Sequence, residues 1–190
     1  FARLGHNPDW HKDHLNIEAR SDVIKSYEAL VVPGLLQIPE YARALIVAAG
    51  ESDVDGLVEE RMARQVILTR EPPPMLWVLL TQNVLDWPVG GPEVMRAQLA
   101  RLLEASEQPN IGIRVVPRTT GAHAGSNGSF KLLSGPAGEF AYTESPGGGR
   151  LVPTVAEVKT FALRYDRIGM HALPEDQSRD MIRQAMEALR

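Results

Sequence analysis

The pattern of apolar and polar residues predicts a strand–helix–strand unit in the middle of the chain. Residues 75–80 (MLWVLL) and 111–116 (IGIRVV) are two nearly continuous apolar runs, which is typical of strands buried on both faces of a sheet. Between them, residues 93–105 place apolar side chains at the spacing of an amphipathic helix. Because a helix connects the two strands, we expect them to be parallel, with a right-handed crossover.

The first third of the chain contains a predicted strand–turn–helix corner, and we expect the rest of the fold to pack around it. Residues 24–32 are apolar and favour a strand, and a Pro-Gly pair ends them. Leu35 and Leu36 follow at once on the turn, and Pro39 then suits the first position of a helix. Two large apolar side chains on a turn must be buried. Two interpretations remain open: the corner fills its own core, or it forms the wall of a pocket or of a partner interface.

The remaining elements complete an α+β fold. We expect a small mixed sheet that contains the parallel unit and an antiparallel hairpin, covered by helices and followed by a helical C-terminus. Residues 1–23 are interpreted as a linker or helix from a preceding part, and residues 24–190 as a single domain. The other predicted elements are the hairpin strands 130–133 and 140–143, a short strand 150–152, and helices 39–49, 54–70, 155–170 and 174–190.

Composition narrows the class of protein without assigning a function. The chain has 190 residues, of which 44% are apolar, and this suits one domain with a real core. Its net charge of -4 gives no general attraction to nucleic acid or to anionic lipid. The absence of cysteine excludes disulfides and thiolate catalysis and favours a reducing cytoplasm. No apolar run is long enough to cross a bilayer.

No known catalytic or metal-binding motif is present in the sequence, so we expect no catalytic residue, metal or cofactor. His123, between glycines in a loop, is the most suggestive histidine for acid–base work. His11, His14 and Glu18 suit one helix face, but a metal site needs further support, and we expect a solvated face there. A solvated face with ion pairs is also expected for three arginines of helix 54–70, namely Arg61, Arg64 and Arg70.

Many short motifs in a fixed order give the chain a family resemblance. It resembles the C-terminal domain of actinobacterial regulators that begin with an Xre-type helix-turn-helix, and the resemblance runs from about Trp10 onward. The DNA-reading helices of that family precede the Trp10 region, whereas this sequence begins at Phe1. A trimmed chain, a lost segment and a member without such helices all stay open. The motifs include VPGLLQ (32–37), YARAL (41–45), VGGPEVM (89–95), VVP (115–117), GAHAG (121–125), GSF (128–130) and YTE (142–144).

One segment departs from the family pattern. Where the family usually has an acidic pair ahead of apolar residues, this chain has the neutral Gln82 and Asn83, and Trp87 follows. Trp87 adds an aromatic surface that can stack on a ligand. The change is either drift on a tolerant surface or an altered pocket.

The resemblance implies a sensor, dimerisation or partner-binding domain of a helix-turn-helix transcription regulator. We expect a homodimer, DNA contact only through an N-terminal domain, and a small apolar ligand or a small partner protein as the binding partner. The alternative is a stand-alone relative acting as a cofactor-independent cyclase or isomerase. In either case we expect Leu35, Leu36 and Tyr41 to line an apolar cavity with Gln82 and Trp87 at its rim, and we include His123 among the ligand- or partner-binding residues.

Overall fold

A six-stranded mixed sheet forms the centre of the computed structural model, which describes residues 9–145 and 148–189. The strands lie in the order β3-β2-β1-β4-β5-β6. Strands β1, β2 and β3 are parallel, and β4, β5 and β6 continue the sheet in antiparallel fashion from β1. The strands are β1 (Val23–Glu28), β2 (Met75–Thr81), β3 (Ile111–Val116), β4 (Phe130–Gly135), β5 (Gly138–Ser145) and β6 (Gly148–Val152).

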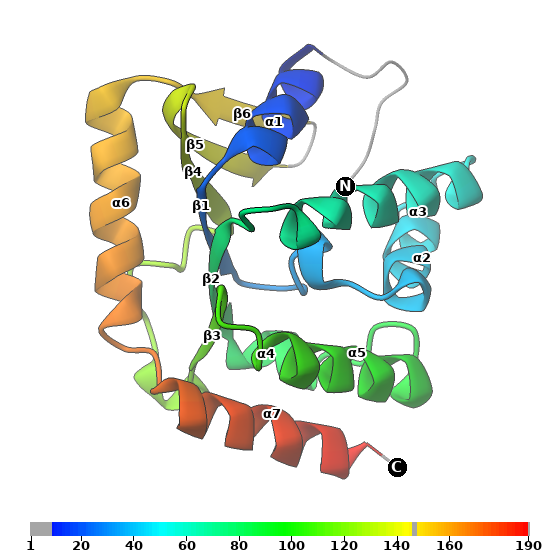
Figure 1. Ribbon diagram of the computed structural model, residues 1–190. Helices are drawn as coiled ribbons and strands as arrows, with labels where there is room; N and C mark the ends of the chain where they lie inside the picture. The colour runs from blue at the N-terminus through cyan, green and yellow to red at the C-terminus, as the bar shows by residue number, and fades with distance from the viewer. Residues whose placement is uncertain (1–8, 146–147, 190) are drawn as a thin grey trace.

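Helices cover the two faces of the sheet unequally, as Figure 1 shows. Helix α6 lies by itself on one face, while α1 to α5 lie on the other and α7 runs along the β3 end of the sheet. The helices are α1 (Asp9–Arg20), α2 (Pro39–Ala48), α3 (Val54–Ala63), α4 (Gln82–Asp86), α5 (Pro92–Ala105), α6 (Val155–Gly169) and α7 (Glu175–Ala188), with 3₁₀ turns η1 (Gly34–Leu36), η2 (Arg64–Thr69) and η3 (Arg118–Thr120).

The two faces of the sheet carry two separate hydrophobic cores. The larger core packs side chains such as Ile24 and Leu80 of the sheet against Leu99 of α5. The smaller core packs Tyr27 and Phe130 against α6. Neighbouring residues of a strand point to opposite faces, so strands β1 to β5 contribute side chains to both cores, and β6 contributes Val152 to the smaller one.

The α+β class, the parallel unit and the antiparallel hairpin are confirmed. Helix α5 connects the parallel strands β2 and β3, and β4 pairs with β5 across a tight turn. The predicted helix pattern is also confirmed, except that the helix expected over 54–70 ends at Ala63 and continues as the 3₁₀ turn η2. The short helix α4 is not among the predicted elements.

Two strand predictions need correction. The strand expected over 24–32 ends at Glu28, where the chain leaves the sheet toward the corner. Strand β2 is not buried on both faces throughout, because Met75 and Trp77 remain exposed where α6 does not cover the sheet.

The apolar stripes of α5 and α7 lie inside the molecule. Leu99 and Leu102 of α5 and Ile182 of α7 belong to the larger core. Apolar stripes of this kind would favour a homodimer if they faced outward, but here one chain buries them. Self-association therefore stays a prediction without that support.

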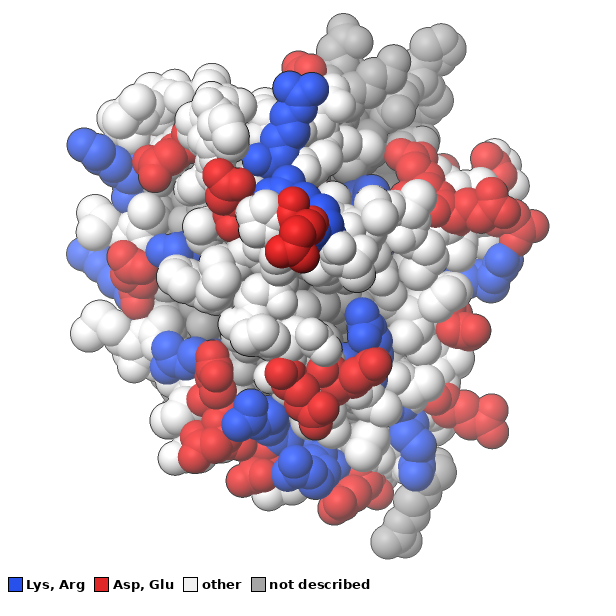
Figure 2. All heavy atoms as spheres, viewed as in Figure 1, with Lys and Arg blue, Asp and Glu red and all other residues white. Residues whose placement is uncertain are grey.

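The charged side chains on the viewed face are mixed in sign. Figure 2 shows lysines and arginines interspersed with aspartates and glutamates, without a continuous basic field. Among the described residues, none of the helices is both long and apolar enough to cross a membrane.

Candidate functional site

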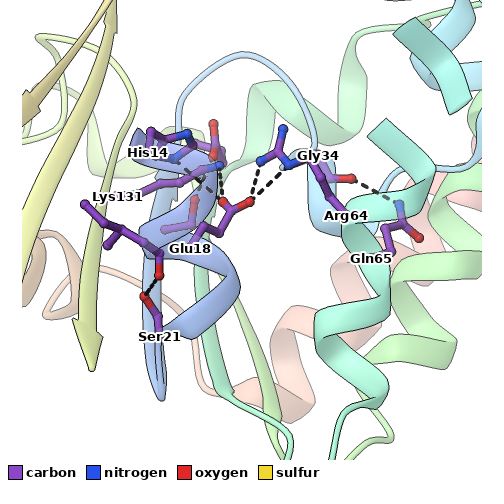
Figure 3. A network of polar contacts seen from close by, with 10 residues as sticks. His14, Glu18, Ser21, Gly34, Arg64, Gln65 and Lys131 are labelled. Atoms are coloured by element: carbon purple, nitrogen blue, oxygen red, sulfur yellow. Dashed lines mark hydrogen bonds and ion pairs between the residues drawn. The ribbon is translucent and has the colours of Figure 1, made fainter. Parts of the chain in front are cut away.

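A buried carboxylate on α1 is the centre of the most concentrated polar cluster. Glu18 is only 2% exposed, and both of its oxygens face cations. Arg64 donates to Oε1 from Nη2 at 2.5 Å and from Nε at 3.1 Å. Lys131 donates to Oε2 from Nζ at 3.1 Å. The Nε2 atom of His14 lies 3.7 Å from the same Oε2, and we call these four residues the Glu18 ion cluster (Figure 3).

The Glu18 ion cluster joins three parts of the chain that are far apart in sequence. Glu18 and His14 come from α1, Arg64 begins η2, and Lys131 lies on β4. The ring of His14 stacks on that of Tyr142 in β5, with centroids 3.7 Å apart. For His14, Glu18 and Arg64 the predicted solvated position is therefore corrected, because His14 and Glu18 are buried and Arg64 turns inward to pair with Glu18. The side chain of His11 lies outside the described residues.

Electrostatics keep Glu18 ionised. Burial alone would raise the pKa of this carboxyl, but the charges of Lys131, Arg64 and then His14 outweigh it and hold the pKa far below its usual range. Burial likewise opposes the charge of Arg64, and Glu18 more than compensates, so the pKa of Arg64 is raised. Removing one partner of such a buried ion pair strongly destabilises the fold, because the other charge stays buried without compensation.

A small hollow lies next to this cluster. Its volume is ≈ 60 Å³, which is enough for a few ordered waters or a small polar group. Arg64 and Lys131 line it, so the two cations that pair with Glu18 also border this space. We call it the corner hollow; its lining consists of Glu28, Val31, Val32, Pro33, Gly34, Gln37, Arg61, Arg64, Lys131 and Glu144.

Glu28 is the carboxyl in the corner hollow whose protonation is most affected by its surroundings. It ends β1 and is 7% exposed, and the hydroxyl of Ser26 donates to its Oε1 at 2.7 Å. Burial, with a smaller contribution from the charge of Glu144, raises the pKa of Glu28 to about 7, although Lys131 and the hydroxyl of Ser26 act against this. This carboxyl therefore gains or loses its proton near neutral pH, as an acid–base group or a proton-sensitive ligand would.

Three glutamines fix the corner that forms one wall of the hollow. Gln37 donates from Nε2 to the carbonyl of Val32 at 2.7 Å. Gln65 donates to the carbonyls of Gly34 at 3.1 Å and of Gln37 at 2.7 Å. Gln98 donates to the carbonyl of Leu36 at 2.8 Å. Since these bonds satisfy buried carbonyls of an irregular segment, the corner is held in one conformation.

The corner residues predicted to line an apolar cavity lie in the larger core instead. Leu35, Leu36 and Tyr41 are fully buried there, and the hydroxyl of Tyr41 accepts a hydrogen bond from the backbone N–H of Val32 at 3.2 Å. None of the three lines the corner hollow. The corner does form a wall, but with its backbone and Gln37, while its two leucines point away into the core.

Gln82 and Trp87 belong to the unpredicted helix α4 and its end. Gln82 accepts a hydrogen bond on Oε1 from the backbone N–H of Arg118 at 3.0 Å. Trp87 is 53% exposed. Neither residue lines the corner hollow, so the structure does not bring them together with Glu28.

His123 makes its contacts within its own loop and with Tyr27. Its Nδ1 accepts a hydrogen bond from the backbone N–H of Gly125 at 3.0 Å, and its ring meets that of Tyr27 edge-on at 6.1 Å. A Cβ atom on Gly125 would lie only 2.3 Å from the Tyr27 ring, which explains a glycine at this position of the GAHAG motif. Burial, and then the charge of His171, lower the pKa of His123. His123 thus packs its loop against Tyr27.

The sequence did not predict the place of Glu28 in the hollow, nor that Gln37 and Gln98 hold the corner by hydrogen bonds to its carbonyls. A signal was present for two of them: Glu28 interrupts an apolar run, and Gln98 lies within the apolar stripe of α5. Within residues 9–145 and 148–189, no group of three or more acidic or histidine side chains is arranged to hold a metal ion.

Comparison with known protein families gives one match across nearly the whole chain. Residues 11–184 match the model of a family described as a domain of unknown function, DUF5753. A search of curated proteins gives no significant match.

Proposed function

The chain belongs to the DUF5753 family, and from this premise we propose that it is the effector-sensing domain of a helix-turn-helix transcription regulator. One observation carries the proposal. Arg64 and Lys131 pair with Glu18 of α1 and also line the corner hollow. A change of charge in the hollow therefore acts on the same two cations that bind α1 to the rest of the fold.

Helix α1 is the element through which such a signal would leave the domain. The resemblance to Xre-type regulators places the DNA-reading helices before this region. A ligand group in the hollow, or a proton on Glu28, changes the field at Arg64 and Lys131 and hence their hold on Glu18. In a dimer, a shift of α1 would alter the spacing of two DNA-reading heads relative to operator half-sites.

The test uses the product of the complete reading frame and DNA from its own promoter. We expect sequence-specific binding by fluorescence anisotropy. Glu28→Gln, which keeps position 28 uncharged at every pH, should change operator affinity about tenfold at about pH 8, a typical allosteric coupling. Asp180→Asn is the matched control, because it removes one carboxylate from an exposed ion pair on α7. Absence of specific DNA binding by the complete protein would exclude this function.

A cofactor-independent cyclase or isomerase is the second candidate, and Glu28 is the observation in its favour. A carboxyl whose pKa is about 7 can both donate and accept a proton at neutral pH. The same DNA-binding experiment separates the two candidates, because a stand-alone enzyme needs no operator. Under the enzyme candidate, Glu28→Gln abolishes turnover while leaving the fold intact.

A further inference from the structure

The α6 face of the sheet carries a second, larger hollow that is independent of the corner and of the proposed function. It lies where the last turns of α6 and the start of α7 meet β2 and β3, and its volume is ≈ 450 Å³. We call it the Trp77 groove, after the indole that is 42% exposed in its wall. Met170, which is 84% exposed, lines the same groove. The volume is within the range of small-molecule sites, roughly 300–1,000 Å³.

A glycine in β3 keeps the groove open. Gly112 is the second residue of β3 and lies opposite Trp77 in β2. A Cβ atom on Gly112 would lie 2.9 Å from Oε1 of Glu175 and 3.5 Å from Cδ1 of Trp77. Glycine inside a strand is otherwise unfavourable and often marks a close approach by another group. Here it makes room for a carboxylate and an indole side by side.

The charges in the groove favour a cation. Glu175 and Asp166 both line it, and within the part of the chain that the structure describes neither carboxylate forms an ion pair. Arg114 is the cation in the lining, but its guanidinium already donates to the backbone carbonyls of Gly169, Ala172 and Leu173. These bonds orient the guanidinium without removing its charge, so the lining has two carboxylates against one cation and keeps a net negative charge.

Aromatic rings beside these carboxylates give the groove an apolar wall. The hydroxyl of Tyr165 donates to the carbonyl of Trp77 at 3.0 Å, which fixes one ring next to the other. The ammonium of Lys25 already lies 5.2 Å from the Trp77 ring centroid and 5.4 Å from that of Tyr165. Lys25 does not line the groove, and its ammonium already occupies the cation–π position on these rings, so they offer a guest their apolar surface.

We propose that the Trp77 groove binds a small organic amine, with its ammonium group at Glu175 and Asp166 and its apolar body against Trp77 and Met170. The ammonium gains an ion pair, while the body covers apolar surface that is otherwise exposed to water. An acid of the same shape meets two carboxylates and is repelled.

The test compares 3-phenylpropylamine with 3-phenylpropanoic acid, which share a shape and differ in charge. The readout is the indole N–H NMR signal of Trp77, assigned with a Trp77→Phe variant. We expect a saturable shift with the amine, little with the acid, and no shift of the Trp87 signal. A Glu175→Gln/Asp166→Asn double variant should weaken the amine about tenfold. Equal or tighter binding of the acid, or no saturable shift with the amine, would overturn the proposal.

Gly112→Ala provides a test inside the groove that does not alter charge. The new methyl group meets the flexible end of Glu175, so the fold should accept it and the thermal midpoint should stay near that of the parent. The amine should lose its affinity because the floor of the groove is filled. If Gly112→Ala binds the amine as the parent does, the amine does not bind in this groove.

Discussion

At the scale of single residues, two buried glutamates respond to pH in opposite directions. The folded state lowers the pKa of Glu18 and raises that of Glu28 to about 7. Glu18 therefore stabilises the fold above its unfolded pKa, and this contribution is lost as the pH falls. Glu28 favours the fold while it is protonated, and this contribution is lost as the pH rises from about 4.5 to about 7.

We predict that Glu18→Gln destabilises the fold by about 3 kcal/mol at neutral pH, because it leaves Arg64 and Lys131 without their carboxylate. Urea unfolding followed by circular dichroism measures the change. The difference from the parent should shrink in acid, because below about pH 4.5 the unfolded parent binds a proton on Glu18 that the folded parent does not. A loss comparable to that of the surface control Asp180→Asn would contradict the buried pairing.

We predict the reverse pH dependence for Glu28→Gln. Near pH 5 the variant and the parent should be similarly stable, since Glu28 of the folded parent is then neutral. Near pH 8 the variant should be more stable, by up to about 3 kcal/mol for a pKa raised from 4.5 to about 7. The measurement is the urea midpoint across this pH range, and parallel profiles for the two proteins would show that Glu28 titrates normally.

At the scale of elements, the periodicity of apolar residues predicts the secondary structure of this chain well. The apolar runs at 75–80 and 111–116 and the helix between them predict the parallel unit correctly, because side-chain spacing sets both burial and secondary structure. The same signal does not tell how far a neighbouring helix reaches. Periodicity therefore predicts that Trp77 is buried, whereas in the structure α6 does not cover this residue and it is exposed.

The candidate site was beyond this kind of prediction because its parts meet only in three dimensions. Glu18, Arg64 and Lys131 lie on three elements, and the register of the sheet sets which of them come together. Charged residues are most often on the surface, so each one taken singly favours a solvated position. The leucines of the corner predict its burial, but the hollow is lined by other residues of the corner, from Val31 to Gly34 and Gln37, and by charged residues around it.

At the corner we predict that Leu36→Ala costs about 2–5 kcal/mol, the range for a large-to-small change in a filled core. Leu36 is fully buried and belongs to the larger core, so the substitution leaves a cavity. Val47→Ala is the control, because Val47 is an exposed residue of α2. Urea unfolding of both variants decides the point. A cost for Leu36→Ala below that range would indicate that an empty space already adjoins the corner.

At the scale of the whole molecule, the charge distribution bears on how the protein would reach DNA. The chain has a net charge of -4, and acids and bases are interspersed over the face in Figure 2. Specific binding to DNA normally needs a concentrated basic surface and an element that enters a groove. In the proposed regulator both would belong to the part that precedes α1.

We predict that the 190-residue chain alone does not bind DNA specifically. The measurement is a gel-shift titration at moderate salt with the promoter fragment that the complete protein recognises, and with a scrambled fragment of equal length. The chain should bind both fragments weakly and equally, with an affinity that falls steeply as salt increases, because only unspecific phosphate contacts remain. The complete protein should prefer the promoter fragment. Sub-micromolar, sequence-specific binding by the chain alone would mean that this fold reads DNA itself, and α1 could then no longer be regarded as the route to a separate DNA-reading part.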